Sequence, residues 1–581
     1  MAANRRDVLK GVALTGALSG LGACARDESA DLVPAQEIES GAGEITIKTI
    51  AEAEKLQGIS FNQQERSMML EGLEQNLQSL ASLQQMEMPN SLAPALEFNP
   101  KLARKKVGSQ KNRVTLAGTY NAPIRSDDDI AFATVAQQGA WLRSGDLSSM
   151  QLTEIYLARI AAHDKRLNAF ITVTAEKAHE QAVKADADLA KGRDRGPLHG
   201  IPYGLKDLAD SKGDRTTWGA SPYKERIAED DAEIARKLRL AGAVLLGKTS
   251  CGALAKGDQW FGARTRNPWN PKEGSSGSSA GSASAIAAGL CSFAIGTETL
   301  GSIISPSERC GATGLRPTYG RVSRAGFMAL SWSLDKVGPI CRSVEDTALV
   351  LSKINGYDAD DPSTARMGFT YDGTLNLSEM VVGYVPDWFA DGDETDRVAL
   401  DETRELGVTL KEFPFPTVDF EALVQTVLVE GAAAFSGLTL SGEDGQLIGQ
   451  EPTDWPNVFR RARFMSAVDY LQIDRLRRQL MIEMMQAFEG FDALIGPHFG
   501  GGALLATNCT GHPQLALRAG FSQKPNRTKF ADDKAAEAAE TFRTPRGISL
   551  WGDLFKEGKI LALGHALEGK LNVAQERPPG F

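Results

Sequence analysis

The order of helical and extended patterns after Asp127 limits the folds open to this chain of 581 residues. "SSMQLTEIYLARI" has the cap and the apolar spacing of a helix, and "AFITV" follows it as a short apolar strand. "DDAEIARKLRLAGAVLLG" then predicts a helix that runs into another strand. Such alternation is typical of an α/β domain around a largely buried sheet. No break in composition divides residues 127–581, so we expect one large domain there.

Composition excludes several classes of protein. With 42% hydrophobic and 24% charged residues, the balance is that of a soluble globular chain with a large core. The net charge of −10 gives no reason to expect a nucleic-acid partner. Six cysteines are too sparse for a disulfide framework, and the six histidines never have metal-ligand spacing. We therefore expect no metal and no cofactor.

The first 24 residues resemble a targeting signal. "NRRDVLK" precedes a mildly apolar run, which is typical of a twin-arginine export signal. "LGAC" resembles a bacterial lipoprotein box with Cys24 lipidated, whereas Ala23 and Ala25 also fit a simple cleavage site. We expect an exported protein, either periplasmic or anchored to the membrane through Cys24 and facing the periplasm. The alternative is a fortuitous basic and apolar start of a cytoplasmic protein.

Three short regions separate this signal from the main domain. Residues 25–43 are polar and predict a disordered linker. Residues 44–87 predict two helices, the first with a capping box from Thr49 to Glu52 and the second starting at Asn62. The second helix carries an apolar stripe that we interpret as packing surface: Met69, Leu70, Leu73, Leu77 and Leu80. Residues 88–126 are basic and punctuated by proline, which indicates an extended connector.

Residues 273–289, "EGSSGSSAGSASAIAAG", could be a flexible linker or part of a site, and two local motifs compete for the chemistry. "GSSAG" matches the G-x-S-x-G nucleophile elbow with Ser279 as the attacking group. The elbow must follow a strand, however, and "RNPWNPKEG" before it predicts turns. "SLDK" supplies an S-x-x-K pair, Ser333 and Lys336, but the K-T-G partner motif of the penicillin-binding class is missing.

A longer set of motifs carries a third interpretation. In order along the chain they are "LHGIPYGLKDLADSKG", "TTWGA", "NPWNP", "GSSGSSAGSASAIAAG", "GTETLGSI", "CGATGLRPTYGRVSRAG" and "SLDKVGPICRSVEDTALVL". With them the chain resembles the amidase signature family of serine amidohydrolases, over nearly all of residues 127–581. Several such motifs in order are much more specific than any one of them.

The resemblance implies a fold and a set of site residues. The fold is a single α/β domain with a central mixed sheet wrapped by helices. Lys206 in "GLKD" matches the family's lysine base, Ser278 the bridging serine that follows an unusual cis peptide, and Ser302 in "LGSI" the nucleophile. The oxyanion hole would be formed by the backbone N–H groups of one turn, Thr299, Leu300, Gly301 and Ser302. Asp335 also fits a family motif, and we interpret it as structural.

The chemistry of hydrolysis agrees with this assignment. A serine hydroxyl is a poor nucleophile until a base takes its proton, and a neutral lysine can do so. Lowering a lysine pKa from ~10.4 to ~7 or 8 means disfavouring the ammonium by about 4 kcal/mol, which burial can supply. Ser278 would relay the proton in both directions, including to the departing amine. We therefore predict hydrolysis of a carboxylic amide of small-molecule size, without a cofactor.

Departures from the family pattern leave alternatives open. Leu300 and Ile304 replace the usual Gly and Arg around the nucleophile, and Ser276 and Ala280 replace customary glycines. A turn that needs positive φ at residue 300 would be distorted by leucine. The loss of an arginine at residue 304 implies that its buried partner is absent as well. The alternatives are therefore a catalytically impaired, exported ligand-binding protein, or the amidase subunit of an amidotransferase, which the export signal disfavours.

Overall fold

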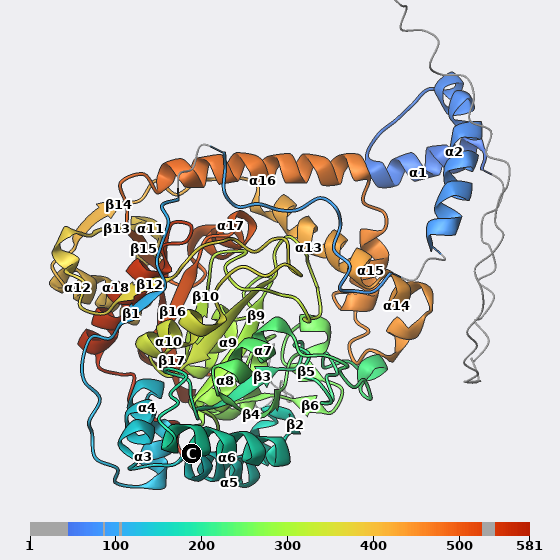
Figure 1. Cartoon of the computed structure of the whole chain (residues 1–581). Helices are drawn as coiled ribbons and strands as arrows, with labels where there is room; N and C mark the ends of the chain where they lie inside the picture. The colour runs from blue at the N-terminus through green and yellow to red at the C-terminus, as the bar shows by residue number, and fades with distance from the viewer. Residues whose placement is uncertain (1–44, 85–87, 104–106, 526–540) are drawn as a thin grey trace, which may run out of the picture. The chain divides into compact units, whose positions relative to one another are not determined.

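The computed structural model describes residues 45–84, 88–103, 107–525 and 541–581 (Figure 1). The predicted signal, with Cys24, and the predicted linker at 25–43 lie outside the described residues. Among the helices that are described, none has both the length and the apolar character needed to cross a membrane.

Helix α1 spans Ile47–Gln57 and begins earlier than its sequence predicted. The capping box joins Thr46 and Thr49, because the Thr46 hydroxyl accepts from the Thr49 N–H at 3.1 Å and the reciprocal bond is also present. The predicted box started at Thr49 and missed this earlier pair. The predicted end is correct, since Gly58 closes the helix with φ 64°, a conformation that glycine adopts at little cost.

Helix α2 spans Gln63–Gln84 and has the predicted cap. Asn62 accepts from the Glu65 N–H at 3.0 Å, and the Glu65 carboxylate accepts from the Asn62 N–H at 2.7 Å. The apolar stripe is packing surface only in part. Met69, Leu70 and Leu73 are half-buried, whereas Leu77 is 47% exposed, and the side chain of Leu80 lies outside the described part.

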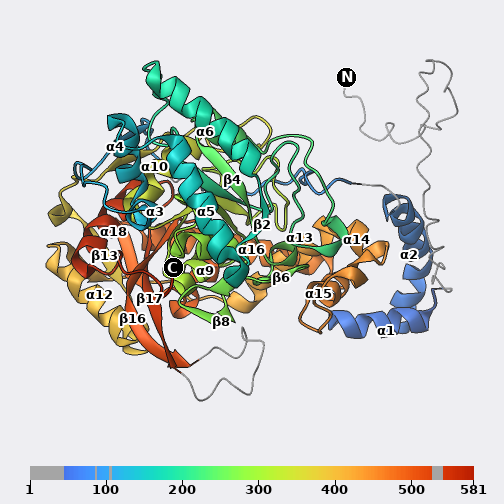
Figure 2. The same cartoon turned by 90° about the horizontal axis from the view of Figure 1, so that it is seen from below.

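An eleven-stranded sheet forms the centre of the main domain (Figures 1 and 2). In spatial order its strands are β14 Thr409–Glu412, β13 Val381–Tyr384, β15 Ala493–Gly496, β17 Thr541–Trp551, β16 Gln514–Pro525, β10 Thr313–Arg316, β11 Lys336–Cys341, β9 Phe293–Glu298, β3 Pro202–Lys206, β4 Val244–Thr249 and β2 Phe170–Val173. The β3 strand pairs parallel with β4 and β9, while β9, β11, β10, β16 and β17 pair antiparallel in succession. The sheet is therefore mixed, as the family resemblance implied.

Helices packed on this sheet or on one another complete the predicted α/β architecture. They are α3 Asp127–Phe132, α4 Val135–Ser144, α5 Ser149–Leu167, α6 Ala175–Ala190, α7 Glu233–Leu240, α8 Ala280–Ala287, α9 Ile304–Cys310, α10 Val344–Ile354, α11 Pro386–Ala390, α12 Glu394–Glu405, α13 Phe420–Ala434, α14 Ser436–Leu440, α15 Trp455–Ala462, α16 Ala467–Ala487, α17 Ala503–Thr510 and α18 Glu557–Leu571. Helix α8 packs on β3, β4 and β9, and α10 packs on β11 and α18. Buried Val, Ile, Leu and Phe side chains of the strands fill the space between these layers.

Two segments differ from their predicted form. The connector at 88–126 contains a short strand, β1 Arg113–Thr115, that pairs in parallel with β12 Thr370–Asp372. "RNPWNPKEG" was predicted as turns, but it forms a small antiparallel hairpin of β7 Arg266–Asn267 and β8 Asn270–Gly274. A second hairpin pairs β5 Gln259–Trp260 with β6 Ala263–Arg264. The turn residues thus correctly predicted a turn in this segment, but the residues on either side of the turn pair as strands.

The parallel pair β3 and β9 positions the candidate site. Leu205 on β3 lies opposite Ile295 on β9, so the carboxyl ends of both strands reach the same edge of the sheet. Lys206 is the last residue of β3, and Ser302 follows four residues after the end of β9. Side chains that stand far apart in the sequence are therefore brought together by strand pairing.

Candidate active site

Lys206 is fully buried and surrounded by neutral oxygen atoms. Its Nζ lies 2.9 Å from Ser278 Oγ, 3.0 Å from Ser279 Oγ and 2.7 Å from Thr297 Oγ1. The Thr297 carbonyl accepts a longer bond at 3.4 Å. None of these partners is a carboxylate, so no adjacent anion replaces the hydration that an ammonium loses on burial.

The surroundings of Lys206 favour the neutral amine. Burial lowers the pKa of Lys206 from 10.5 to about 7. The shift follows from the cost of holding a charge away from water, and the Cys251 thiol and the carboxylates of Asp335 and Glu298 oppose it without reversing it. At neutral pH a large share of the lysine therefore has a free lone pair, which can take a proton from a hydroxyl.

The serine-rich loop before α8 is held closely against neighbouring backbone. The peptide bond between Gly277 and Ser278 is cis, as the family resemblance implied. A Cβ atom on Gly277 would lie 1.8 Å from the carbonyl oxygen of Gly257, so only glycine fits there. Ser276 has φ 62°, and its hydroxyl hydrogen-bonds to Ser305 at 2.7 Å. The loop thus accommodates serine at residue 276, where the family usually has glycine. Ala280, at the second customary glycine position, is the first residue of α8.

The Ser279 hydroxyl is engaged on all sides. It donates to the Thr297 carbonyl at 3.0 Å and accepts from the Thr297 N–H at 3.1 Å and from Lys206 Nζ at 3.0 Å. A hydroxyl has one proton and two lone pairs, so these contacts use its full capacity. Ser279 therefore ties the loop to the end of β9. This arrangement does not fit the attacking group of a nucleophile elbow.

Ser278 and Ser302 are both nearly buried, with 1% and 7% of their surfaces exposed. The Ser279 N–H donates to the backbone carbonyl of Ser302 at 3.1 Å, which places the two loops side by side. Within the described residues, Ser302 Oγ makes no hydrogen bond, either to Ser278 or to another group. Lys206 and Ser278 are therefore joined directly, and Ser302 stands beside them with an unengaged hydroxyl.

The turn that leads to Ser302 resolves the question raised by Leu300. The positive φ in this turn, 81°, belongs to Gly301, whereas Leu300 does not have a positive φ. Leucine at residue 300 is thus compatible with the turn, and the expected distortion is absent. The N–H groups of Leu300, Gly301 and Ser302 donate to no acceptor in the part of the chain that the structure describes. They remain available to an oxyanion.

A buried carboxylate holds the residues that directly follow Ser302. Glu298 accepts from the N–H groups of Ile303 and Ile304 at 2.8 and 3.0 Å. Arg316 donates to the same carboxylate at 2.8 Å, and both charged side chains are fully buried. The charges of this buried pair come from Glu298 and from Arg316 in the motif "LRPTYGR", and Ile304 takes part only through its backbone N–H.

The competing pair Ser333 and Lys336 is not joined. Ser333 Oγ donates to Glu430 at 2.5 Å and accepts from Arg477 at 2.8 Å. Lys336 Nζ donates to the backbone carbonyl of Leu334. Burial lowers the pKa of Lys336 to about 7 as well, but its amine does not contact the Ser333 hydroxyl. The S-x-x-K motif therefore has no nucleophile–base contact here.

Several site residues carried no role in the sequence interpretation. Thr297 contacts Lys206, although the motif "GTETLGSI" assigns it no role. Asp207, next to Lys206, accepts from the Thr217 N–H at 2.9 Å and lies 3.6 Å from Lys248 Nζ, with all these side chains buried. The sequence indicated Asp207 and Thr217 only through their positions in the motifs "GLKD" and "TTWGA". The contacts of these side chains depend on the fold.

Asp335 has the structural role expected of it. Its carboxylate accepts from the Thr299 hydroxyl at 2.5 Å and from the N–H groups of Leu330 and Ser331 at 2.8 and 3.0 Å. It thus fastens the 330–331 loop to the start of the Ser302 turn. Burial raises the pKa of Asp335 above its ordinary value.

A cavity of about 340 Å³ opens beside these groups. Thr297, which contacts Lys206, and Thr299 line it, and much of its wall is apolar, with Leu208, Phe327 and Trp332 among the lining residues, although Asp335 and Lys336 line it as well. No group of three or more His, Cys, Asp or Glu side chains suited to a metal ion occurs in the described ranges. The arrangement offers a desolvated amine, hydroxyls and free N–H groups next to an apolar cavity, which is the equipment for acyl transfer.

Comparison with known proteins agrees with this geometry, since the amidase family model matches residues 151–561. The chain belongs to the amidase signature family. A glutamyl-tRNA(Gln) amidotransferase subunit of Methylobacillus flagellatus is 32% identical over 503 residues, covering 77% of this chain and 99% of that protein. The native peptide amidase of Stenotrophomonas maltophilia is 31% identical, with a TM-score of 0.66, and the match covers 77% of this chain and 98% of that one. Amidase signature enzymes thus share both the sequence motifs and the mixed-sheet fold of this chain.

Proposed function

We propose that this protein hydrolyses a carboxylic amide through a serine acyl-enzyme, with Ser302 as nucleophile, Ser278 as proton relay and Lys206 as base. The observation that carries the proposal is the contact between Lys206 Nζ and Ser278 Oγ at 2.9 Å inside a desolvated site. Because burial lowers the pKa of Lys206 to about 7, the amine can accept a proton at neutral pH. No metal or cofactor is needed for this step.

The proton path balances over the reaction. Ser302 Oγ attacks the carbonyl carbon and gives its proton to Ser278, whose own proton passes to Lys206. The negative oxygen of the tetrahedral intermediate accepts from the backbone N–H groups of the turn: Thr299, Leu300, Gly301 and Ser302. The proton then returns through Ser278 to the nitrogen, so that an amine leaves rather than an amide anion. Water attacks the acyl-enzyme by the same relay and restores Ser302.

The contact between Ser278 and Ser302 forms during this cycle. Because the Ser302 hydroxyl makes no hydrogen bond within the described residues, it can turn toward Ser278 without breaking one. Catalytic hydrogen bonds often tighten only when substrate is bound. The common loop contact, from the Ser279 N–H to the Ser302 carbonyl, keeps the two backbones in place for it.

Labelling with a fluorophosphonate tests the nucleophile. Peptide mapping should place the adduct on Ser302, and Ser302→Ala should abolish both labelling and turnover. Ser278→Ala should slow both severely. Ser279→Ala is the matched control: it should lower stability, because the Thr297 N–H and carbonyl lose their partner, while the adduct still forms on Ser302. An adduct on Ser279 or Ser333 would overturn the assignment, and no adduct anywhere would favour a catalytically impaired binding protein.

An amidotransferase component is the second candidate, because proteins so named are 32% identical to this chain. The two candidates differ in what the purified chain can do alone. A hydrolase should release ammonia or an amine from simple amides, from aryl amides or from peptide amides, the last because a peptide amidase is 31% identical. Hydroxylamine should intercept the acyl-enzyme as a hydroxamate. Glutamine hydrolysis seen only with added partner proteins would favour the amidotransferase.

We propose further that the protein is exported, on the basis of Arg5, Arg6 and Cys24 in its first residues. Replacing both arginines by lysine should leave the protein in the cytoplasm. Cys24→Ala should release it from the membrane fraction if Cys24 is lipidated, and should leave a soluble periplasmic protein unchanged if the signal is simply cleaved. Mass spectrometry of the N-terminus decides, because an intact Met1 or Ala2 in the exported pool would contradict the proposal.

A further inference from the structure

Two cavities lie next to one another in front of the candidate site. The first, of about 340 Å³, has Thr297 and Thr299 in its wall. The second, of about 490 Å³, lies between the connector at 88–103 and helices α13 and α16. The two share five wall residues, Ala93, Arg324, Trp332, Asp361 and Pro362, so they adjoin.

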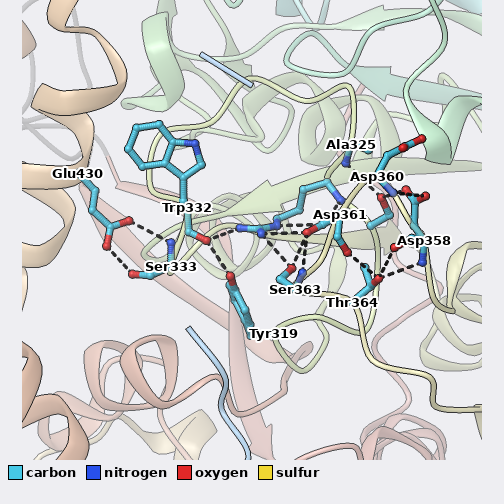
Figure 3. A network of polar contacts seen from close by, with 12 residues as sticks. Tyr319, Ala325, Trp332, Ser333, Asp358, Asp360, Asp361, Ser363, Thr364 and Glu430 are labelled. Atoms are coloured by element: carbon cyan, nitrogen blue, oxygen red, sulfur yellow. Dashed lines mark hydrogen bonds and ion pairs between the residues drawn. The ribbon is translucent and has the colours of Figure 1, made fainter. Parts of the chain in front are cut away.

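The boundary between the cavities is held by a network of polar contacts (Figure 3). The backbone carbonyl of Trp332 accepts from Arg324 and from the Tyr319 hydroxyl, the latter at 2.7 Å. Arg324 also donates to Asp361 at 3.2 Å and to Ser363 at 2.9 Å. The charge of Arg324 is thus engaged within the protein. This boundary presents a fixed indole to a ligand rather than an available cation.

The connector forms the roof of both cavities. Ser91 lines the first cavity, Ala93 lines both, and Leu96 and Phe98 line the second. The segment is drawn in blue between α2 and β1 in Figure 1. The ring of Phe98 lies under the guanidinium of Arg477, 3.6 Å from its centroid, which fixes the far end of this segment on α16.

Asn90 fastens the near end. Its Oδ1 accepts from the Ala329 N–H at 2.6 Å, and its Nδ2 donates to the Ala329 carbonyl at 2.8 Å and to the Ala434 carbonyl at 3.4 Å. The Trp332 indole N–H donates to the Asn90 carbonyl at 3.4 Å. One side chain of the connector therefore binds the loop that lines the first cavity and the end of α13. The match to the amidase family model begins at residue 151, well after this segment.

We infer that the connector closes an elongated substrate site, in which an amide bound at Ser302 extends beneath Ala93 into the second cavity. The inference rests on the proposed function and names its substrate class: amides that carry a long uncharged alkyl or aryl group. The second cavity is lined by apolar side chains over much of its wall, namely Leu96, Phe98, Tyr319, Val429, Leu471 and Met481. Four basic residues also line it: Arg324 is engaged with Asp361 and Ser363, Arg477 with Ser333 and Cys509, Lys101 is half-buried and Arg478 is exposed to solvent. Asn90 acts as a positioning residue that holds the roof in place.

Blocking the passage between the cavities tests this inference. Ala93→Trp places an indole where both cavities meet, while Ala95→Trp is the matched control, because Ala95 is exposed on the same segment and lines neither cavity. We expect kcat/KM for decanamide or for N-octylacetamide to fall by about tenfold or more in Ala93→Trp, and kcat/KM for propionamide to change by less than about twofold. Ala95→Trp should leave all three unchanged. An equal loss on long and short amides, or no loss on any, would overturn the inference.

Asn90→Ala provides a second variant that does not fill space. Loosening the roof should raise KM for decanamide and leave kcat for propionamide unaltered, which a general loss of folding would not do. A uniform fall in kcat with unchanged KM would contradict the role of Asn90.

Binding separates the failure of this inference from failure of the proposed function. Calorimetric titration of the Ser302→Ala protein should show tighter binding of decanamide than of propionamide, and Ala93→Trp in that background should remove the difference. Length-dependent binding without hydrolysis by the unaltered protein would refute the proposed function and still support the elongated site. Equal binding of long and short amides would refute the elongated site even if both are hydrolysed.

Discussion

Acidification should switch off the proposed base, and the structure sets the size of the effect. The difference between 10.5 and about 7 for Lys206 amounts to roughly 5 kcal/mol in favour of the neutral amine, at about 1.4 kcal/mol per pKa unit. Only the neutral form can accept the proton of Ser278. Between about pH 8 and about pH 5 the neutral fraction falls roughly 90-fold, so kcat/KM should fall by a similar factor, with a slope of one per pH unit below pH 7.

The assay is the pH dependence of kcat/KM on an amide that does not itself titrate. Two buried lysines, Lys206 and Lys336, have a pKa of about 7, so the fall of kcat/KM at low pH, the acid limb of the profile, must be assigned to one of them. Lys336→Met should keep the limb, because Lys336 donates to the Leu334 carbonyl and touches no hydroxyl of the site. Lys206→Arg should lose turnover at every pH, since a guanidinium stays protonated.

Two results would refute this reasoning. One is an acid limb that disappears in Lys336→Met, and the other is turnover in Lys206→Arg comparable to that of the unaltered protein. Thermal unfolding of each variant, followed by circular dichroism, shows that the comparison is made between folded proteins.

Further predictions concern the turn and the buried charges. Gly301→Ala should lower kcat by about tenfold or more, since φ 81° at residue 301 disfavours alanine. Leu300→Gly should change kcat by less than about threefold. A larger loss of kcat in Leu300→Gly than in Gly301→Ala would contradict the assignment of the positive φ to residue 301. Glu298→Gln should reduce the free energy of unfolding by about 3 kcal/mol or more in urea titrations, because it leaves Arg316 buried without a carboxylate; an unchanged midpoint would be inconsistent with that ion pair. Burial raises the pKa of Glu568 from 4.5 to about 8, so the folded state keeps a proton that the unfolded chain releases, and stability should fall as pH rises through this interval. Glu568→Gln should therefore raise the Tm above pH 8 and leave it nearly unchanged at low pH; a gain confined to acid would have the wrong sign.

Local sequence patterns correctly predicted the positions of many helices and strands. The helix at Ser149–Leu167, the strand at Phe170–Val173 and the strand at Val244–Thr249 lie where apolar periodicity and caps predicted them. Such signals act within a few residues of each other, so the sequence carries them directly. The hairpin of β7 and β8 was missed because its pairing is decided across the turn, and α1 begins earlier because Thr46 caps it.

Ordered motifs also predicted which loops meet at the candidate site, and they indicated Lys206, Ser278 and Ser302. The consequences of Leu300 and Ile304 could not be read in this way. The first depends on which residue of the turn takes the positive φ, which is Gly301. The contacts behind residue 304 also depend on the fold, because Arg316 on β10 reaches Glu298 on β9 across the intervening strand β11.

The α/β class, the family and the residue types available for catalysis thus follow from short-range patterns and from motifs in fixed order. The protonation of Lys206 depends on packing instead, since the lowered pKa comes from burial by segments distant in the sequence. The roof of the cavities at Asn90 and Ala93 also depends on packing, because the Asn90 side chain contacts Ala329, more than 200 positions away. A pKa and a cavity wall depend on what surrounds a side chain in space, and packing between remote segments sets those surroundings.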